Sequence, residues 1–154
     1  MKKGRELKNL PVIDVNSGRQ LGCIREFELE DNRKIAGIYI NSGRDECYYI
    51  PLGLISSIGR DAVLVTGWIP ASQEELEELK DKTKTRYTGA QVLTSLGQSI
   101  GTIEDIVIEE SEGSIMGYEV SDGLFKDMAL GRKVIAAADI LTYGDETIIV
   151  ADSN

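Results

Sequence analysis

Two segments of this chain repeat one pattern of glycines and large apolar residues. The first is GRQLGCIREFEL, Gly18–Leu29, and the second is GQSIGTIEDIVI, Gly97–Ile108. Two further pairs of matching segments follow in the same order: IAGIYI with IMGYEV (Ile35–Ile40, Ile115–Val120), and YIPLGLISSIGRDAVLV with IAAADILTYGDETIIV (Tyr49–Val65, Ile135–Val150). Three matching blocks in one order predict that a single fold occurs twice in the chain.

The spacing of apolar residues inside the first block predicts a strongly curved sheet. Residues two apart share one face of a β-strand, but Ile24 and Phe27 are three apart, and so are Ile103 and Ile106. A β-bulge absorbs one extra residue, bends the strand and increases its twist. The same spacing in both copies therefore predicts a bent sheet, as in a small barrel, and an all-β fold.

The second block of each copy is expected to be the returning strand of a hairpin. The polar segments EDNRK and EESEGS precede these strands and are expected to form the turns. Gly37 and Gly117 lie inside the returning strands, where glycine usually marks a bend or a close backbone approach.

A polar segment, IPASQEELEELKDKTKTR, connects the two copies. Ser72 and Glu75 have the spacing of a helix capping box. Leu76 and Leu79 are the apolar pair of this segment, so we expect a short, mostly exposed helix. The predicted organisation is a first barrel, a helical linker and a second barrel, over residues 1–70, 71–86 and 87–154.

Composition places the chain among soluble globular proteins. Its 154 residues are 42% apolar and 28% charged, and no apolar run approaches the roughly 20 residues of a membrane-spanning helix. The basic start lacks the apolar core of a signal peptide, so we expect a cytoplasmic protein. Cys23 and Cys47 are expected to be reduced, buried thiols. The absence of histidine excludes catalytic pairs of the Ser-His and Cys-His kind.

The formal net charge of −9 lies almost entirely in the second copy. Residues 1–70 hold ten basic and nine acidic side chains, whereas residues 87–154 hold three basic and twelve acidic ones. Proteins bind nucleic-acid backbones by neutralising phosphates with lysine and arginine, so we expect no direct nucleic-acid binding by the second copy. A protein partner of that copy is expected to present a basic surface.

The repeated blocks resemble the PRC-barrel family, named after the cytoplasmic barrel of the photosynthetic reaction-centre H subunit. The resemblance lies in the opening G-x-x-(L/I)-G-x-I, in the central glycine of the returning strand, and in Y-I-P-L-x-x-I, at Gly18–Ile24, Gly97–Ile103 and Tyr49–Ile55. It covers nearly the whole chain outside the connector, as two tandem copies. The second copy departs from the pattern at Ala136, which stands where the first has Pro51.

This resemblance implies two small, strongly bent β-barrels. Members of the family serve as attachment and assembly modules, for example as the C-terminal barrel of a bacterial ribosome maturation factor. Others are small stand-alone proteins, some of them linked to sporulation. The family has no shared catalytic residue, and fold alone does not determine function.

The second copy contains an insertion, SDGLFKDMALGRK, where the first copy has NSGRDECY. It adds four large apolar side chains to a region expected to be a loop: Leu124, Phe125, Met128 and Leu130. If exposed, they would form a patch of the kind that marks an interaction surface. If packed inward, they would close one end of the barrel or the gap between the barrels.

Tyr48 and Tyr49 form a second candidate interaction surface. Alternation along a strand lets only one of them point inward, which leaves the other as an exposed aromatic suited to contacts. The alternative is a surface tyrosine without a function. Carboxylates gather at Glu104–Asp105, Glu109–Glu112 and Glu28–Asp31 without the spacing of a calcium loop, and we interpret them as solvated charge on hairpin turns.

The sequence therefore contains no pattern of a catalytic, metal-binding or cofactor-binding site, and we expect neither enzymatic activity nor a cofactor. The favoured function is a cytoplasmic adaptor or assembly module that binds another macromolecule, above all a protein, through its barrel surfaces. Two alternatives remain. One is a protein that binds a small ligand or metal ion in the groove between the barrels, and the other is a ribosome- or RNA-associated factor acting through the first copy.

Overall fold

The computed structural model describes residues 1–31, 34–86, 88–121, 132–144 and 146–151 of the chain. The strands of the first copy are β2 (Pro11–Asp14), β3 (Gln20–Glu30), β4 (Lys34–Asn41), β5 (Cys47–Pro51), β6 (Ile55–Ile58) and β7 (Val63–Val65). Those of the second copy are β9 (Gln91–Thr94), β10 (Ser99–Glu109), β11 (Ser114–Ser121), β12 (Arg132–Ala136), β13 (Ile140–Tyr143) and β14 (Thr147–Val150). A 3₁₀ turn follows β5 and β12, as η1 (Leu52–Leu54) and η3 (Ala137–Asp139). The remaining elements are β1 (Lys2–Lys3), α1 (Gly4–Lys8), β8 (Ile69–Ala71) and α2 (Gln73–Arg86).

The two copies have the same strand order, which confirms the predicted repeat. Paired neighbours run β6-β7-β2-β3-β4-β5 in the first copy and β13-β14-β9-β10-β11-β12 in the second. In each copy one parallel pair, β2 with β7 or β9 with β14, lies among antiparallel pairs. The fold is all-β, as expected, and each copy contributes a strongly bent half of one sheet. Among the described strands, the path of pairing from β13 to β6 does not close on itself.

β-Bulges occur at the positions that the spacing predicted. The register of β3 to β4 shifts at Ile24–Glu26, and the register of β10 to β11 shifts at Ile103–Asp105. A second shift follows later in each of the two strands. Each first bulge returns the next apolar side chain to the core, so that Phe27 is 1% exposed and Ile106 fully buried.

The central glycines of the returning strands lie where another group approaches the backbone closely, which confirms their predicted role. A methyl group on Gly117 would overlap the backbone oxygen of Ile135 on the neighbouring strand. A methyl group on Gly37 would overlap the hydroxyl group of Tyr49. A side chain at either position would therefore push the neighbouring strand or its tyrosine away.

The two copies pair edge to edge through equivalent residues. Lys34 on β4 lies opposite Ser114 on β11, and these are matching positions of the repeat. The backbone N–H of Ile35 donates a 2.8 Å hydrogen bond to the carbonyl of Gly113. An interface in which a residue contacts its own equivalent has two-fold form. Here it joins the copies into one continuous sheet, with one cluster of buried apolar side chains drawn from both.

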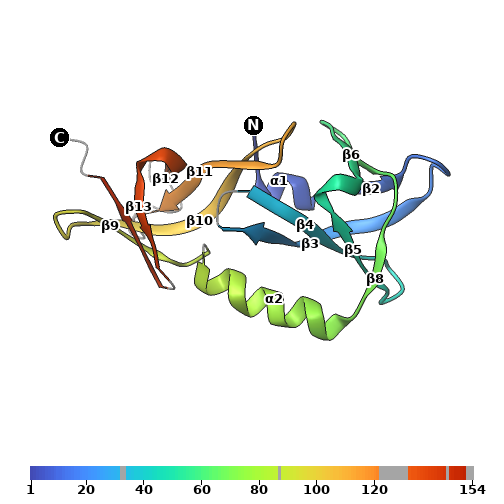
Figure 1. Ribbon diagram of the computed structural model, residues 1–154, viewed down its shortest axis with the longest axis horizontal. Coiled ribbons are helices and arrows are strands. Elements are labelled where there is room, and N and C mark those ends of the chain that lie inside the picture. Colours follow the sequence, from blue (N-terminus) through green and yellow to red (C-terminus); the bar gives the residue numbers. More distant parts are fainter. Residues whose placement is uncertain (32–33, 87, 122–131, 145, 152–154) are drawn as a thin grey trace.

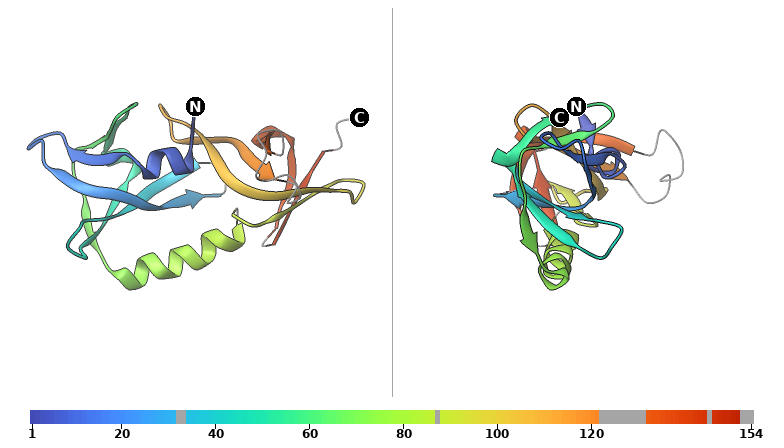
Figure 2. Two further views of the ribbon diagram at one scale, coloured as in Figure 1. Left: turned by 180° about the vertical axis from the view of Figure 1, so that it is seen from behind. Right: turned by 90° about the vertical axis from the view of Figure 1, so that its right-hand side faces the viewer.

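The N-terminal segment contacts both copies (Figure 2). β1 pairs antiparallel with β10, and α1 contacts both β3 and β10. Leu7 is the fully buried apolar residue of α1. Lys8 Nζ lies 3.8 Å from Glu26 Oε1, and Arg5 Nη1 lies 3.3 Å from Asp105 Oδ2. One short helix therefore supplies a cation to the same position of each copy.

Glu26 and Asp105 are buried, which corrects the interpretation of Asp105 as solvated charge. Glu26 is 7% exposed and Asp105 is 8% exposed. Each carboxylate accepts a hydrogen bond from the next backbone N–H, over 3.3 Å from Phe27 and over 2.8 Å from Ile106. The physical reason is the bulge, which turns an acidic side chain back towards its own backbone and the cations of α1.

Glu119 on β11 is a buried carboxylate with two cationic partners. Its side chain is 3% exposed and lies 2.6 Å from Lys3 Nζ and 2.7 Å from Arg5 Nη1. Burial alone would raise the pKa of this carboxyl, but the hydrogen bonds and charges of Arg5 and Lys3 outweigh it and lower the pKa to about 2. Glu119 is therefore ionised at neutral pH and links the N-terminal segment to the second copy.

The connector forms α2, within the predicted limits. The backbone N–H of Glu75 donates to Ser72 Oγ over 3.1 Å, as expected for the N-cap. Leu76 is 1% exposed and Leu79 is half-buried, which confirms the narrow apolar stripe. Figure 1 shows α2 running along one side of the molecule, and it contacts β3 of the first copy. Within the described ranges, no helix has the length and apolar character needed to span a membrane.

The two cysteines have different environments. Cys47 is buried, as expected, but Cys23 is exposed. Because Ile24 points into the core, its neighbour Cys23 lies on the outer face of the same strand. The expectation of a buried thiol is therefore wrong for Cys23.

Candidate functional site

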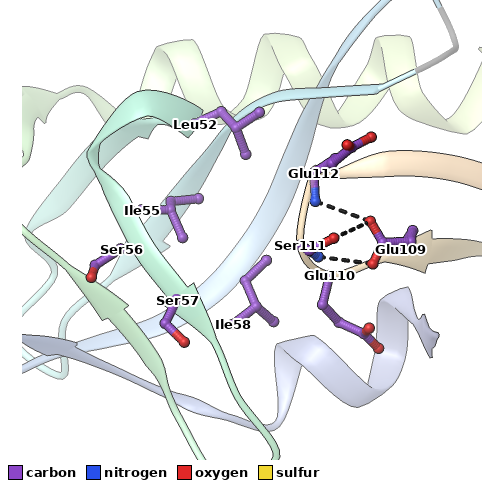
Figure 3. Close-up of a pocket in the computed structure, with 9 residues that line it drawn as sticks. All are labelled: Leu52, Ile55, Ser56, Ser57, Ile58, Glu109, Glu110, Ser111 and Glu112. Carbon is purple, nitrogen blue, oxygen red and sulfur yellow. Dashed lines mark hydrogen bonds between the residues drawn. The ribbon is translucent and has the colours of Figure 1, made fainter.

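A cleft of about 460 Å³, which we call the seam cleft, lies where the two copies meet. One wall consists of Leu52 and Ile55–Ile58, from η1 and β6 of the first copy. The other wall is Glu109–Glu112, at the turn between β10 and β11 of the second copy. Figure 3 shows the two walls facing each other. The fold thus brings together segments that are at least 51 positions apart in the sequence.

The two walls of the seam cleft differ in chemistry. The first copy contributes three branched aliphatic side chains, from Leu52, Ile55 and Ile58, together with Ser56 and Ser57. The second copy contributes three carboxylates, from Glu109, Glu110 and Glu112. Gly113 follows the turn with a φ of 70°, and a methyl group on it would lie 2.9 Å from Leu52 Cδ1. The acidic turn is therefore seated directly against the apolar wall.

The carboxylate of Glu109 is fixed by hydrogen bonds inside the turn. It accepts bonds from Ser111 Oγ over 2.7 Å, from the backbone N–H of Ser111 over 3.0 Å and from that of Glu112 over 3.0 Å. These bonds, above all the one from the Ser111 hydroxyl, lower the pKa of Glu109. Glu109 is therefore a negative charge of defined position at neutral pH.

This arrangement suits a cationic side chain with an apolar stem. Lysine and arginine cover apolar surface with their methylene groups while the charged head stays in polar surroundings. The methylene groups of a lysine or arginine could pack against Ile55 and Ile58 while its charged group contacts the carboxylates of the turn. In the described part of the chain, no group of three or more His, Cys, Asp or Glu side chains is placed to hold a metal ion.

The segment of the second copy that matches one wall of the seam cleft lines a hollow of its own. It measures about 350 Å³, and its described lining is Ile115, Ala137, Ala138, Ile140 and Tyr143. Ala137 stands where the seam cleft has Leu52. The described lining of this hollow includes no carboxylate.

Tyr49, one of the predicted interaction residues, lies half-buried on β5. Its ring packs on that of Tyr39 with the centroids 4.8 Å apart, and its hydroxyl donates to Glu28 Oε1 over 2.8 Å. Burial, followed by the bond to the Glu28 carboxylate, raises the pKa of the Tyr49 hydroxyl. Both ends of this side chain are thus occupied by contacts within the first copy.

Tyr48 is also half-buried, and it reaches a depression at the surface. Its ring meets Trp68 edge-on with the centroids 6.3 Å apart, and its hydroxyl donates to Glu46. It lines a depression of about 680 Å³ together with Arg19 and Arg44, among others. Neither Tyr48 nor Tyr49 lines the seam cleft.

The other predicted surface falls outside the described residues: Leu124, Phe125, Met128 and Leu130. A groove between the barrels was named from the sequence as an alternative binding site, but its lining was missed, because sequence reasoning interpreted Glu109–Glu112 as solvated charge. One signal was present in the repeat. This turn carries three glutamates, whereas the matching turn of the first copy, EDNRK, mixes acidic and basic residues.

Comparison with known proteins agrees with this architecture. The family model of the PRC-barrel domain matches residues 1–67 and residues 83–154. Among curated proteins, the uncharacterised protein YrrD of Bacillus subtilis (strain 168) is 28% identical over 144 residues, which cover 88% of this chain and 79% of YrrD. The two family matches and the shared strand order show that the chain belongs to the PRC-barrel family, with two tandem copies of the domain.

Proposed function

We propose that this chain is a non-catalytic adaptor that binds another protein through the seam cleft, and that the partner inserts a lysine or arginine there. The observation that supports this most directly is the fixed carboxylate of Glu109 opposite the aliphatic side chains of Ile55 and Ile58. A cationic head and an apolar stem are the groups that such a pair of walls can bind together.

The distribution of charge supports the same kind of partner. Residues 87–154 carry nine more acidic than basic side chains, and such a field steers a basic surface towards the protein. The seam cleft, at about 460 Å³, holds one or two side chains rather than a whole interface. Stable protein interfaces bury about 1,600 Å² in total, so the cleft acts as the central contact of a larger surface.

The test compares two pairs of substitutions. Glu109→Gln with Glu112→Gln removes two carboxylates from the cleft, and glutamine at position 109 keeps one of the two oxygens that accept the hydrogen bonds of the turn. Glu74→Gln with Glu78→Gln removes two exposed carboxylates from α2, so this variant has the same net charge as the first. We call the two double variants the cleft pair and the α2 pair. Partners are recovered from the native cell with the full chain at several salt concentrations, and their affinities are then measured. We expect the cleft pair to weaken binding at least tenfold, about 1.4 kcal/mol, and the α2 pair to leave it nearly unchanged.

Two results would contradict this proposal. A partner that binds the cleft pair as tightly as the parent would place its contact elsewhere on the molecule. Recovery of no stoichiometric partner across the salt series would argue against an adaptor of any kind.

The competing function, binding of a metal ion or small ligand in the same cleft, makes a different prediction. A ligand at 100 times its Kd adds about 2.7 kcal/mol to the free energy of unfolding. We expect a thermal-shift screen with Mg²⁺, Ca²⁺, Mn²⁺, Zn²⁺ and common metabolites to leave the Tm unchanged. A shift that the cleft pair abolishes and the α2 pair retains would favour the ligand-binding function instead.

A further inference from the structure

One strand edge that is covered in the first copy has no described partner in the second. In the first copy, β8 pairs antiparallel with β5, which places Ile69 opposite Tyr49 and Pro70 opposite Tyr48. β12 is the equivalent of β5, because both pair with the returning strand in the same register and both lead into a 3₁₀ turn. β12 pairs with β11 on one side, and no described strand pairs with its other side.

The side chains of β12 show the same difference between the copies. Val134, the equivalent of Tyr49, is 57% exposed, whereas Tyr49 is half-buried. Lys133, the equivalent of Tyr48, is exposed. The backbone of β12 is nevertheless held as a strand by five paired positions on β11. The second copy thus has a preformed strand edge on which Val134 is an exposed apolar side chain and Lys133 an exposed cationic one.

The first copy shows what kind of segment fits such an edge. β8 is a short extended segment, antiparallel to β5, with an apolar residue, Ile69, opposite Tyr49. Strand addition at an exposed edge gains affinity from backbone hydrogen bonds and specificity from alternate side chains. Opposite charges directly across an antiparallel pair stabilise it, and like charges destabilise it. An occupant of the β12 edge therefore needs an acidic residue opposite Lys133.

We propose that the outer edge of β12 binds an extended segment of another polypeptide, antiparallel, with an apolar residue opposite Val134 and an acidic residue opposite Lys133. This surface is separate from the seam cleft, whose lining contains no residue of β12. The result of the binding test at the seam cleft therefore does not decide the result of the peptide test at β12.

The probe is a peptide derived from β8 itself. TGWIEAS is the segment Thr66–Ser72 with glutamate in place of Pro70, and TGWIKAS is its matched partner of opposite charge. The full chain is labelled with ¹⁵N, and the chemical shifts and hydrogen exchange of the β12 amides are followed. We expect TGWIEAS to shift and protect these amides and to bind at least fivefold more tightly than TGWIKAS. In a Lys133→Glu variant, which changes an exposed side chain, the preference is expected to reverse.

Several outcomes would overturn the proposal. Protection of the β12 amides without peptide, at every protein concentration, would mean that the chain covers this edge itself. Protection that grows with protein concentration would mean that a second copy occupies it. Absence of any peptide effect, or a preference that Lys133→Glu does not reverse, would show that the edge does not select a partner in this way.

Discussion

Replacing Glu119 with glutamine is expected to lower the free energy of unfolding by about 3 kcal/mol at pH 7. The carboxylate is 3% exposed and contacts both Lys3 and Arg5. Its pKa is about 2 in the folded chain, against about 4.3 for an unperturbed glutamate. Glutamine has nearly the same shape but no charge, so the substitution removes the ion pairs and leaves the packing. Urea unfolding followed by circular dichroism measures the difference.

The same substitution is expected to remove part of the acid sensitivity of the fold. A carboxyl whose pKa is lower in the folded state stabilises the protein above its unfolded pKa, and this stabilisation is lost as the pH falls towards the folded pKa. For Glu119 this range runs from about pH 4.3 down to about 2. Across it, the stability of the parent falls more steeply than that of Glu119→Gln, and the two free energies of unfolding converge.

Glu30→Gln is the control for this experiment. Glu30 pairs with Lys34 over 3.5 Å, but both side chains are more than half exposed, at 55% and 52%. Exposed pairs contribute about 0–1 kcal/mol, so Glu30→Gln is expected to change the free energy of unfolding by about 0.5 kcal/mol at most. Equal losses in the two variants, or parallel pH profiles for the parent and Glu119→Gln, would contradict the role assigned to Glu119.

Replacing Gly22 with alanine is expected to destabilise the fold by more than about 3 kcal/mol. Gly22 has a φ of 149°, in a region that residues with a side chain rarely adopt. An added methyl group would overlap the carbonyl oxygen of Asn41 and lie 2.7 Å from its carbonyl carbon. These atoms belong to the backbone of β4, which cannot rotate aside as a flexible side chain can. Thermal and urea unfolding measure the loss.

Gly43→Ala is the matched control for Gly22→Ala. An added methyl group at Gly43 would meet no atom within 4 Å, so we expect a change of about 1 kcal/mol or less. Gly101 occupies the position of Gly22 in the second copy, with a φ of 145°, and its replacement is expected to be destabilising as well. If Gly22→Ala were as mild as Gly43→Ala, β3 and β4 would have to separate at this point without loss, contrary to the register described above.

The local features of the fold could be predicted from the sequence because each leaves a local pattern. The three-residue spacing from Ile24 to Phe27 indicated the bulge, and its recurrence in the second copy indicated the repeat. Gly37 indicated a close approach, and Ser72 indicated the start of α2. These patterns arise from the geometry of one strand or one helix, so a single stretch of sequence is enough to show them.

The contacts of the N-terminal segment could not be predicted, because they join distant residues without a periodic pattern. Arg5 and Glu119 are 114 positions apart, and Leu7 is the one fully buried apolar residue of α1. A partial signal was present in IMGYEV, where Glu119 interrupts an otherwise mostly apolar strand at the position of Tyr39 in the first copy. A buried charge requires a partner, but the sequence does not show which residue supplies it.

One wall of the candidate site was visible in the sequence, but its position and the aliphatic wall opposite were not. The sequence showed a run of glutamates, Glu109–Glu112, on a hairpin turn. It could not show that this turn packs against Leu52, because that contact depends on how the two copies meet. The pairing of Lys34 with Ser114 decides this arrangement, and neither residue has a feature that marks it as an interface residue.

The strand pairing at the junction between the copies is symmetric, but the helix that packs on the junction is not. Equivalent positions, Lys34 and Ser114, meet across it, yet a single helix, α1, contacts the bulged strands of both copies. The seam cleft at this junction has its acidic wall on the second copy. A molecule that spans the junction therefore meets a different order of groups in each direction. Because the two copies lie in one chain, the two halves of the junction differ. In a symmetric dimer of identical barrels the two halves would be equivalent.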